Sequence, residues 1–332
     1  MFRRLSIFGG FETHFREKPG DFGLRLGKRL HFRAGGYALR VAIISRRPDV
    51  YATRRLADGV AAAGHEPLVI DQGDCALVVS ENGPGVLHRG APLPAVDVAI
   101  PRIGPTATDY GIALVRQLEA LQTPVLNSAS AIAATKDRLR CLQLLASAGL
   151  PVPNTVLARA PSGAQSAVDV AGGPPVVLKL PRSAKGIGVM LAESVTSARA
   201  ILETFWALGE DLLIQESIEG ALRQDTRLVV LQGEVVAAMQ RTAMPEEFRA
   251  NIHRGAEARA AAPSDEECRL ALHATAALGL DLAGVDLVEG PIGPIILEVN
   301  STPGLEGVER ATEKDIASLI VAAAVELRKG VG

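Results

Sequence analysis

Two apolar segments close to the C-terminal end, residues 283–288 and 295–299, are separated by a short turn rich in glycine and proline. The first contains Asp286, and the second contains Glu298 and is followed by Asn300. Alternate residues of a strand face the same side, so Glu298 and Asn300 share one face and Leu297 and Val299 take the other. The pattern predicts an antiparallel hairpin in which Asp286 lies across from Glu298, with the turn within residues 289–293.

Two carboxylates and one amide oxygen on the same face form an all-oxygen site. Magnesium ions prefer such ligands and are usually completed by phosphate oxygens. Alternatively, Asp286 and Glu298 only solvate an exposed strand. The apolar residues between them and the Ser-Thr-Pro-Gly loop after Asn300 favour the metal interpretation.

A second pattern surrounds Lys179, which lies in an apolar strand between Leu178 and Leu180. A buried ammonium group needs an anionic partner. The loop that follows contains Gly186 and Gly188, and its backbone N–H groups could contact phosphates. A glycine turn between two strands is common, so this signal is weak alone. Neither G-x-x-x-x-G-K-[ST] nor G-x-G-x-x-G occurs in the chain.

Residues 241–254 are rich in cations and polar groups, namely Arg241, Arg249, Asn251, His253 and Arg254. They are equally consistent with a solvated basic loop and with a binding site for a phosphoryl group or a carboxylate substrate. The segment holds more cations than one phosphoryl group needs. It therefore predicts a dicarboxylic amino-acid substrate, glutamate being favoured over glutamine.

Short apolar strands alternate with helices over residues 41–128, which predicts a parallel α/β layer. The strands expected there are 41–44, 67–71, 96–101 and 124–126, and the helices are 53–63 and 110–121. Thr135 is expected to cap a helix that ends at Ala148, with Lys136 in its first turn. Further strands are expected at 175–180, 189–192, 212–215, 227–232 and 234–240, and further helices at 197–207, 265–278 and 313–328.

Composition excludes several classes of protein. The chain has 332 residues, of which 48% are hydrophobic and 22% charged, as in ordinary globular proteins. No apolar stretch approaches the ~20 residues of a membrane-spanning helix, and the start is a poor secretory signal. Three widely spaced cysteines suit a reducing cytoplasm. We therefore expect a cytoplasmic protein with no membrane partner.

Charge is unevenly distributed along the chain. Residues 1–40 hold nine basic and three acidic residues, a net charge of +6, whereas the remaining 26 basic and 34 acidic residues give −8. The net charge of −2 argues against nucleic-acid binding by the whole chain, so any such contact would fall to residues 1–40. Their six phenylalanines predict instead that part of this segment is ordered against the body or a neighbouring subunit. A chain of residues 41–332 is expected to stay active.

Together these motifs resemble the RimK group of ATP-grasp ligases over about residues 41–328. The order of ATP-grasp motifs is carried by Lys136, Lys179 and its glycine loop, Gln215–Ile218, Asp225, Arg249–Gly255, Asp286, Glu298 and Asn300. The closer likeness is carried by Pro101–Gly104, Thr135–Arg140, Gln143–Ala146, Gly186–Val189, Phe248–Gly255, Ala283–Asp286 and Glu298–Gly307. That group adds glutamate to the C-terminus of the sixth protein of the small ribosomal subunit.

The resemblance implies a mixed α/β chain with the ATP-grasp fold. Residues 41–128 would form a parallel α/β pre-ATP-grasp domain and residues 1–40 a basic extension. Residues 129–213 would form the central subdomain with the glycine loop. Residues 214–332 would form the C-terminal subdomain with the metal site. It also implies a homo-oligomer, most simply a tetramer.

The resemblance further implies a role for each site residue. The ATP phosphates would be contacted by Lys136, Lys179, Arg249 and Asn251. The backbone of Glu216 and Ser217 would contact the adenine edge, and Asp225 would bind the ribose. Asp286, Glu298 and Asn300 would bind two magnesium or manganese ions. Lys179, Arg241 and Arg249 would stabilise the reacting groups while a carboxylate is phosphorylated and then attacked by the amine of free L-glutamate. No side-chain nucleophile is needed for this chemistry.

Three other functions fit parts of the pattern. The same chemistry could act on a small-molecule acceptor, as in coenzyme or amino-acid biosynthesis. A catalytically silent nucleotide-binding regulator would be expected to have lost a metal ligand, and all three are present. A ribosome-associated binding protein could use the basic residues 1–40, although the intact site suggests that such binding would accompany catalysis.

Overall fold

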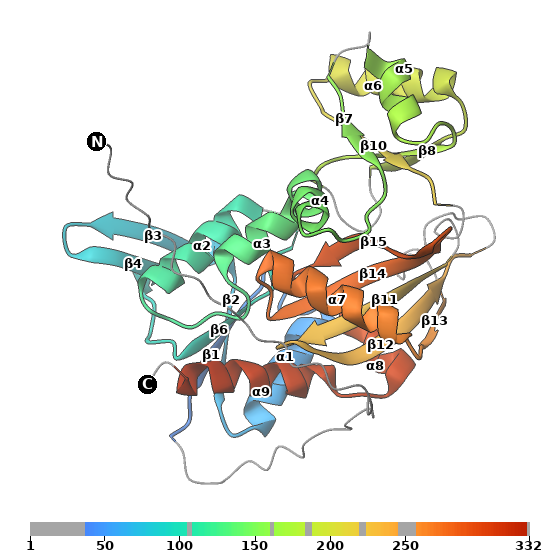
Figure 1. Ribbon diagram of the computed structural model, residues 1–332. Coiled ribbons are helices and arrows are strands. Elements are labelled where there is room, and N and C mark those ends of the chain that lie inside the picture. Colours follow the sequence, from blue (N-terminus) through green and yellow to red (C-terminus); the bar gives the residue numbers. More distant parts are fainter. Residues whose placement is uncertain are drawn as a thin grey trace, which may run out of the picture. The chain divides into compact units, whose positions relative to one another are not determined.

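The computed structural model describes residues 37–104, 108–159, 163–182, 188–218, 224–244 and 257–330 (Figure 1). Its first sheet is parallel, with the order β2-β1-β6 formed by Glu66–Ile70, Arg40–Ile44 and Val98–Pro101. Alternate residues of β1 enter two different cores. Val41 and Ile43 pack with α1 (Tyr51–Ala62) and α9 (Ile316–Lys329), and Ala42 and Ile44 pack with α2 (Thr108–Ala120). Burial on both faces explains the continuous apolar runs and confirms the predicted parallel layer.

A small antiparallel sheet interrupts this layer and was not predicted. It has the order β3-β4-β5, formed by Cys75–Ser80, Gly83–His88 and Ala91–Pro92, and follows a 3-10 turn over Gln72–Asp74. The strand expected at 124–126 is reduced to a single parallel bridge between Ala99 and Val125. The segment 124–126 therefore does not form a fourth strand of the parallel sheet beyond this single bridge.

Two consecutive helices lead from the parallel layer to the next sheet, α3 (Ala129–Lys136) and α4 (Arg138–Ser147). The prediction that Thr135 caps the second helix is wrong. Asp137 is the cap, since its carboxylate accepts a hydrogen bond from the Arg140 N–H at 3.0 Å. Thr135 instead lies in the last turn of α3 and donates its hydroxyl to Ile132 O. Lys136 consequently lies at the end of one helix rather than in the first turn of another.

The second large element is an antiparallel sheet with the order β7-β10-β8-β9. Its strands are Thr155–Leu157, Leu213–Glu216, Val176–Lys179 and Val189–Ala192. Helices α5 (Ala164–Val170) and α6 (Val195–Ala207) share an apolar core with these strands, which includes Val176, Leu178 and Ile214. Burial of Leu178 fixes the strand register and thereby the direction of its neighbour Lys179.

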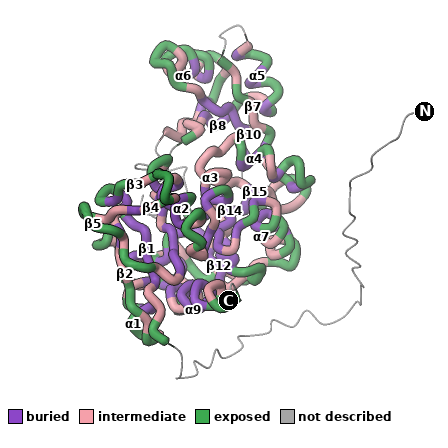
Figure 2. Tube along the Cα trace, turned by 90° about the vertical axis from the view of Figure 1, so that its left-hand side faces the viewer, coloured by how far each residue is buried: buried purple, intermediate pink, exposed green. Residues whose placement is uncertain are grey.

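The third large element is a five-stranded antiparallel sheet with the order β13-β12-β11-β14-β15. Its strands are Glu257–Ala260, Glu234–Thr242, Gln224–Leu231, Leu282–Gly290 and Gly293–Asn300. One face packs on α7 (Asp265–Leu278), and the other contributes to the core shared with α1 and α9. Figure 2 shows β12 and β14 buried along much of their length.

The C-terminal helix begins later than predicted. Glu313 does not start it but ends α8 (Glu306–Thr312), where it adopts a left-handed conformation with φ of 57°. Asp315 then caps α9, accepting a hydrogen bond from the Ser318 N–H. Among the described residues, no helix is long and apolar enough to cross a membrane. Of the basic extension expected at residues 1–40, residues 1–36 lie outside the described residues. Strand β1 begins at Arg40.

Candidate active site

The hairpin predicted at residues 283–299 is present as β14 and β15. Asp286 lies opposite Glu298, and Gly284 lies opposite Asn300. The expected orientation of Leu297 is wrong, because a bulge between Asp286 and Leu287 shifts the register. Ile296 enters the core beneath the sheet with Val299, while Leu297 lines a pocket together with Glu298.

Asp286 is buried within a network of four charges. Arg227 donates from Nε and Nη2 to its two carboxylate oxygens at 2.6 Å each, and Arg241 Nη2 donates to Oδ2 at 2.9 Å. Arg241 also forms a two-bond ion pair with Asp225, with distances of 2.6 and 2.5 Å. Although burial opposes ionisation of Asp286, the two guanidinium groups hold the pKa of its carboxyl below the ordinary value.

This network bears on the roles expected for Asp225 and Arg241. Both oxygens of Asp225 accept from Arg241, and the same guanidinium contacts Asp286. The side chains of Asp225 and Arg241 are only 11% and 7% exposed. Ribose binding by Asp225, or contact of Arg241 with a reacting group, would require one of these buried ion pairs to open.

The ligand set predicted for magnesium fits the hairpin in part. Glu298 is 43% exposed and offers its carboxylate to the pocket. Asp286 Oδ1 accepts only from Arg227 Nε among the described residues, which leaves a lone pair for a metal. No three His, Cys, Asp or Glu side chains among the described residues form a metal cluster. A magnesium ion here would therefore draw on Asn300 and on ligand phosphates as well.

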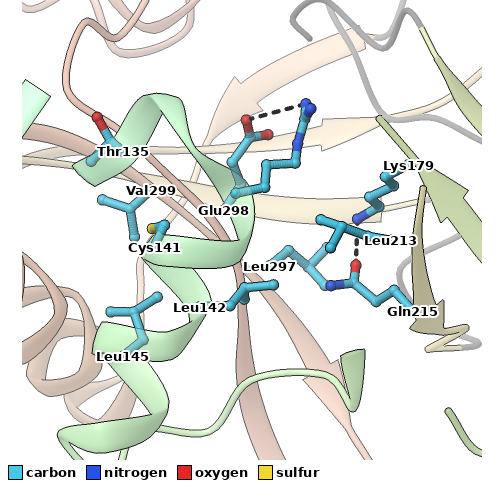
Figure 3. A pocket seen from close by; sticks show the side chains of 11 residues that line it. Thr135, Cys141, Leu142, Leu145, Lys179, Leu213, Gln215, Leu297, Glu298 and Val299 are labelled. Carbon is cyan, nitrogen blue, oxygen red and sulfur yellow. Dashed lines mark hydrogen bonds and ion pairs between the residues drawn. The ribbon is translucent and has the colours of Figure 1, made fainter. Parts of the chain in front are cut away.

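Lys179 reaches the same pocket from the four-stranded sheet (Figure 3). It donates a hydrogen bond to Gln215 Oε1, whose amide in turn donates to Thr155 Oγ1 at 2.9 Å. Burial lowers the pKa of Lys179 to about 8, and the negative charge of Glu298 partly offsets that effect. The apolar wall of the pocket is formed by Cys141, Leu142, Leu145, Leu213, Leu297 and Val299. The apolar wall of this pocket could contact a flat ring, and the half-buried Lys179 could bind an anion.

Arg138 is a site residue that the sequence analysis missed. It is the first residue of α4 and lines the pocket, where its Nη2 lies 3.8 Å from Glu298 Oε1. Its Nη1 also donates to Leu180 O at 2.8 Å, and its backbone N–H donates to Pro181 O. Arg138 thus ties the start of α4 to the segment that enters the glycine loop. An arginine directly after the Asp137 cap was the available signal.

Lys136, by contrast, does not line this pocket. Its Nζ donates to Thr302 Oγ1 at 3.3 Å, on the loop that follows Asn300. Burial, and next the nearby Arg102, lower the pKa of Lys136 to about 8. The two lysines predicted to act together are therefore held by different parts of the chain.

The predicted adenine-reading residues lie at the end of β10. The Glu216 N–H donates to Asn154 O at 2.8 Å, and the Glu216 carboxylate accepts from the Asn154 backbone and side chain. Contacts to an adenine edge from this pair would consequently fall to the Glu216 carbonyl and to Ser217. Arg249, Asn251, His253, Arg254 and Gly186 lie outside the described residues, so their expected roles stay predictions.

A four-stranded antiparallel sheet places the half-buried Lys179 at the same pocket as Glu298 of a five-stranded sheet, an arrangement typical of ATP-grasp enzymes. Models of two protein families match the chain in tandem: the RimK PreATP-grasp domain over residues 39–132 and the RimK-like ATP-grasp domain over residues 135–324. The chain belongs to the RimK-like ATP-grasp family, as its motifs suggested, and is an ATP-dependent ligase with the predicted mixed α/β fold.

Relatives of known name refine this assignment. A probable alpha-L-glutamate ligase of Marinomonas sp. (strain MWYL1) is 44% identical over 283 residues, which cover 85% of this chain and 94% of the relative. One of Vibrio vulnificus (strain YJ016) is 43% identical over 282 residues, with the same coverage. The chain is thus a member of the alpha-L-glutamate ligase group within its family.

Solved structures support the fold. A RimK domain ATP-grasp protein from Sphaerobacter thermophilus DSM 20745 has a TM-score of 0.67 and 26% identity, covering 86% of this chain and 99% of that one. The ATP-grasp ligase PsnB, complexed with a phosphomimetic variant of its minimal precursor, Mg and ADP, has a TM-score of 0.68 and 22% identity, covering 88% and 99%. ATP and magnesium are accordingly the typical requirements of this fold.

Proposed function

We propose that this ligase joins L-glutamate to the C-terminal carboxylate of a protein, with the sixth protein of the small ribosomal subunit as the first acceptor to test. The observation that carries the proposal is the meeting of Lys179, Arg138 and Glu298 around one pocket. Two supports are independent of it: relatives named probable alpha-L-glutamate ligases, and ATP-grasp neighbours whose structures contain precursor peptides.

The residues suit phosphoryl transfer to a carboxylate. The acceptor carboxylate attacks the γ-phosphorus of ATP, which forms an acyl phosphate and releases ADP. The glutamate amine then attacks the acyl carbon, which forms the amide and releases phosphate. Lys179 and Arg138 would hold the phosphates in a water-poor pocket, so catalysis rests on positioning and on charge. Arg138 here takes the place that the sequence suggested for Lys136.

The apolar wall around Leu297 and Leu213 would hold the adenine ring, with Glu216 and Ser217 at its edge. Asp286, Glu298 and Asn300 would hold two magnesium ions, which when bound neutralise charge on the phosphates. Arg249 and Asn251 retain their proposed phosphate contacts, whereas a ribose contact of Asp225 would require its ion pair with Arg241 to open. Metal titration of ADP release would give the number of ions. Light scattering would test the proposed homo-tetramer, and fractionation of cells the proposed cytoplasmic location.

The deciding experiment is incubation with ATP, magnesium, L-glutamate and purified small-subunit ribosomal proteins, followed by intact-mass measurement. We expect one protein to gain mass in steps of a glutamyl residue. The matched controls are Lys179→Met enzyme and the same acceptor with an amidated C-terminus, and neither should yield product. Glutamyl transfer to small amino acids or coenzymes, with none to proteins, would favour the small-molecule alternative and refute this proposal.

A further inference from the structure

Arg102 and Lys136 meet at a second place beside the hairpin, outside the pocket. Arg102 follows β6 directly, and its Nη2 donates to Pro303 O at 2.7 Å. Lys136 donates to Thr302 Oγ1, and this hydroxyl donates to Ile103 O at 3.3 Å. Both cations are thereby fixed against the loop 301–304, which begins one residue after Asn300.

Neither cation has a carboxylate partner among the described residues. No acidic side chain there lies within the 4.0 Å of an ion pair with Arg102 or Lys136, although five other arginines reach an acid at 2.7 Å or less. The Arg102 Nη1 atom is buried and has no hydrogen-bond partner. Two half-buried like charges at one place are unfavourable without an anion, and the negative charge of Glu298 offsets this only in part for Lys136; burial lowers the pKa of Arg102 to about 10.

The position of this pair suggests where such an anion would come from. It lies at the carboxyl end of β6 in a parallel sheet, where ligands of open α/β sheets usually bind. It is adjacent to the strand that bears Glu298 and Asn300 but does not line the apolar pocket. Lys179 and Arg138 already serve that pocket. The pair is therefore available to the other reactants.

We propose that Arg102 and Lys136 form a binding site for a substrate carboxylate, belonging either to free glutamate or to the acceptor. A guanidinium group presents parallel N–H donors that match the two oxygens of a carboxylate. The inference rests on the proposed function and deepens it. It replaces the prediction that Arg241 helps to select a dicarboxylic amino acid, because Arg241 is already paired with two aspartates.

The test compares Arg102→Met, Arg102→Lys and Lys136→Met with wild-type enzyme. The matched control is Arg116→Met, which removes an exposed arginine of α2. Donor specificity is measured as kcat/KM for L-glutamate, for its α-amide and for glutamine, and the KM values for ATP and for a glutamate-terminated acceptor are measured in parallel. Melting temperatures establish which variants are folded.

If the site binds a carboxylate of free glutamate, kcat/KM for glutamate falls roughly 10- to 100-fold in Arg102→Met, the effect of one charge-assisted hydrogen bond. The amide that lacks the recognised carboxylate is then nearly unaffected, which also shows which carboxylate is bound. If the site binds the acceptor, the acceptor KM rises and the donor ratios stay constant. Arg102→Lys should recover part of the loss in either case.

Three results would overturn the inference. Parallel loss with glutamate and both amides, without a change in acceptor KM, would mean that Arg102 only supports the loop 301–304. A rise in the ATP KM alone would assign the pair to nucleotide phosphates. Unchanged kinetics in folded Arg102→Met and Lys136→Met would leave the pair without a ligand. Failure of wild-type enzyme to transfer glutamate would instead refute the proposed function, so the two failures are distinguishable.

Discussion

Asn127 offers the sharpest test of how the site is held in place, because its side chain uses its full hydrogen-bonding capacity. Its amide nitrogen donates to Leu282 O at 2.8 Å and to Ser301 O at 3.0 Å. Its amide oxygen accepts from the Asp281 and Leu282 N–H groups at 2.7 and 2.8 Å. The residue is 1% exposed, so water cannot easily replace these bonds. Asn127 thus joins the end of the parallel layer to both ends of the hairpin.

The Asn127→Ala substitution removes all four bonds and leaves four backbone groups without partners. At about 1 kcal/mol for each net hydrogen bond, the free energy of unfolding should fall by about 3–5 kcal/mol. For a folded unit of about 300 residues, the entropy of unfolding is roughly 0.6 kcal/mol per kelvin. The melting temperature should therefore drop by about 5–8 °C. The rate of ATP turnover should also fall, even at temperatures below the new melting temperature. The reason is that Asn127 holds Ser301, which directly follows the proposed metal ligand Asn300.

Calorimetry of the full chain gives the melting temperature, and two further variants make the result specific. Asn127→Asp keeps the shape and the acceptor but loses both donated bonds, so it should also be strongly destabilised. Gln165→Ala removes an exposed amide that bonds Asp169 and should change stability by less than about 0.5 kcal/mol. A melting temperature for Asn127→Ala within about 1 °C of wild type would refute the reasoning.

Three shorter predictions concern the site and the arm. Glu298→Ala should abolish acceptor-dependent ADP release while circular dichroism shows an intact fold, and ADP release at the wild-type rate would contradict its role. Because burial lowers the pKa of Lys179 to about 8 and phosphates bind its protonated form, the KM for ATP should rise between pH 7 and 9 in wild type. The rise should be absent or much smaller in Lys179→Met, and a pH-independent KM in wild type would count against phosphate binding by Lys179. Removal of residues 1–36, which keeps Arg40 in β1, should preserve turnover across a salt series, whereas complete loss in a folded protein would place the arm in the active site.

The elements that could be predicted from sequence are those whose pattern is local. The helix 265–278 was predicted to the residue, because Ser264 caps it and Gly279 follows it. Asp286 and Glu298 could be placed opposite each other because a short turn fixes hairpin register. The bulge that turns Leu297 into the pocket has no such local signal. It follows from packing of Ile296 and Val299 against α7.

The start of α4 shows why the sequence does not settle which of two nearby polar residues caps a helix. Thr135 and Asp137 are both good caps in principle. Thr135 is held elsewhere, since its hydroxyl is hydrogen-bonded to Ser301 Oγ at 2.8 Å, across 166 residues of sequence. Asp137 is then the cap that remains, and Arg138 becomes the first residue of α4. A contact distant in sequence thus decided which cation reached the pocket.

The same reasoning shows why the sequence alone could not tell which cations are already paired. The resemblance implied an anion-binding role for both Arg241 and Lys136, yet their partners in the structure differ. Arg241 is enclosed by Asp225 and Asp286, and extracting it would leave buried carboxylates without their charge partner, a cost of about 3–5 kcal/mol. Lys136 is half-buried near Arg102, so an incoming anion would relieve repulsion instead of breaking a pair. Among the described residues, Arg102 and Lys136 lack a carboxylate partner and Arg241 has two, so we propose the former pair, and not Arg241, for binding a substrate carboxylate.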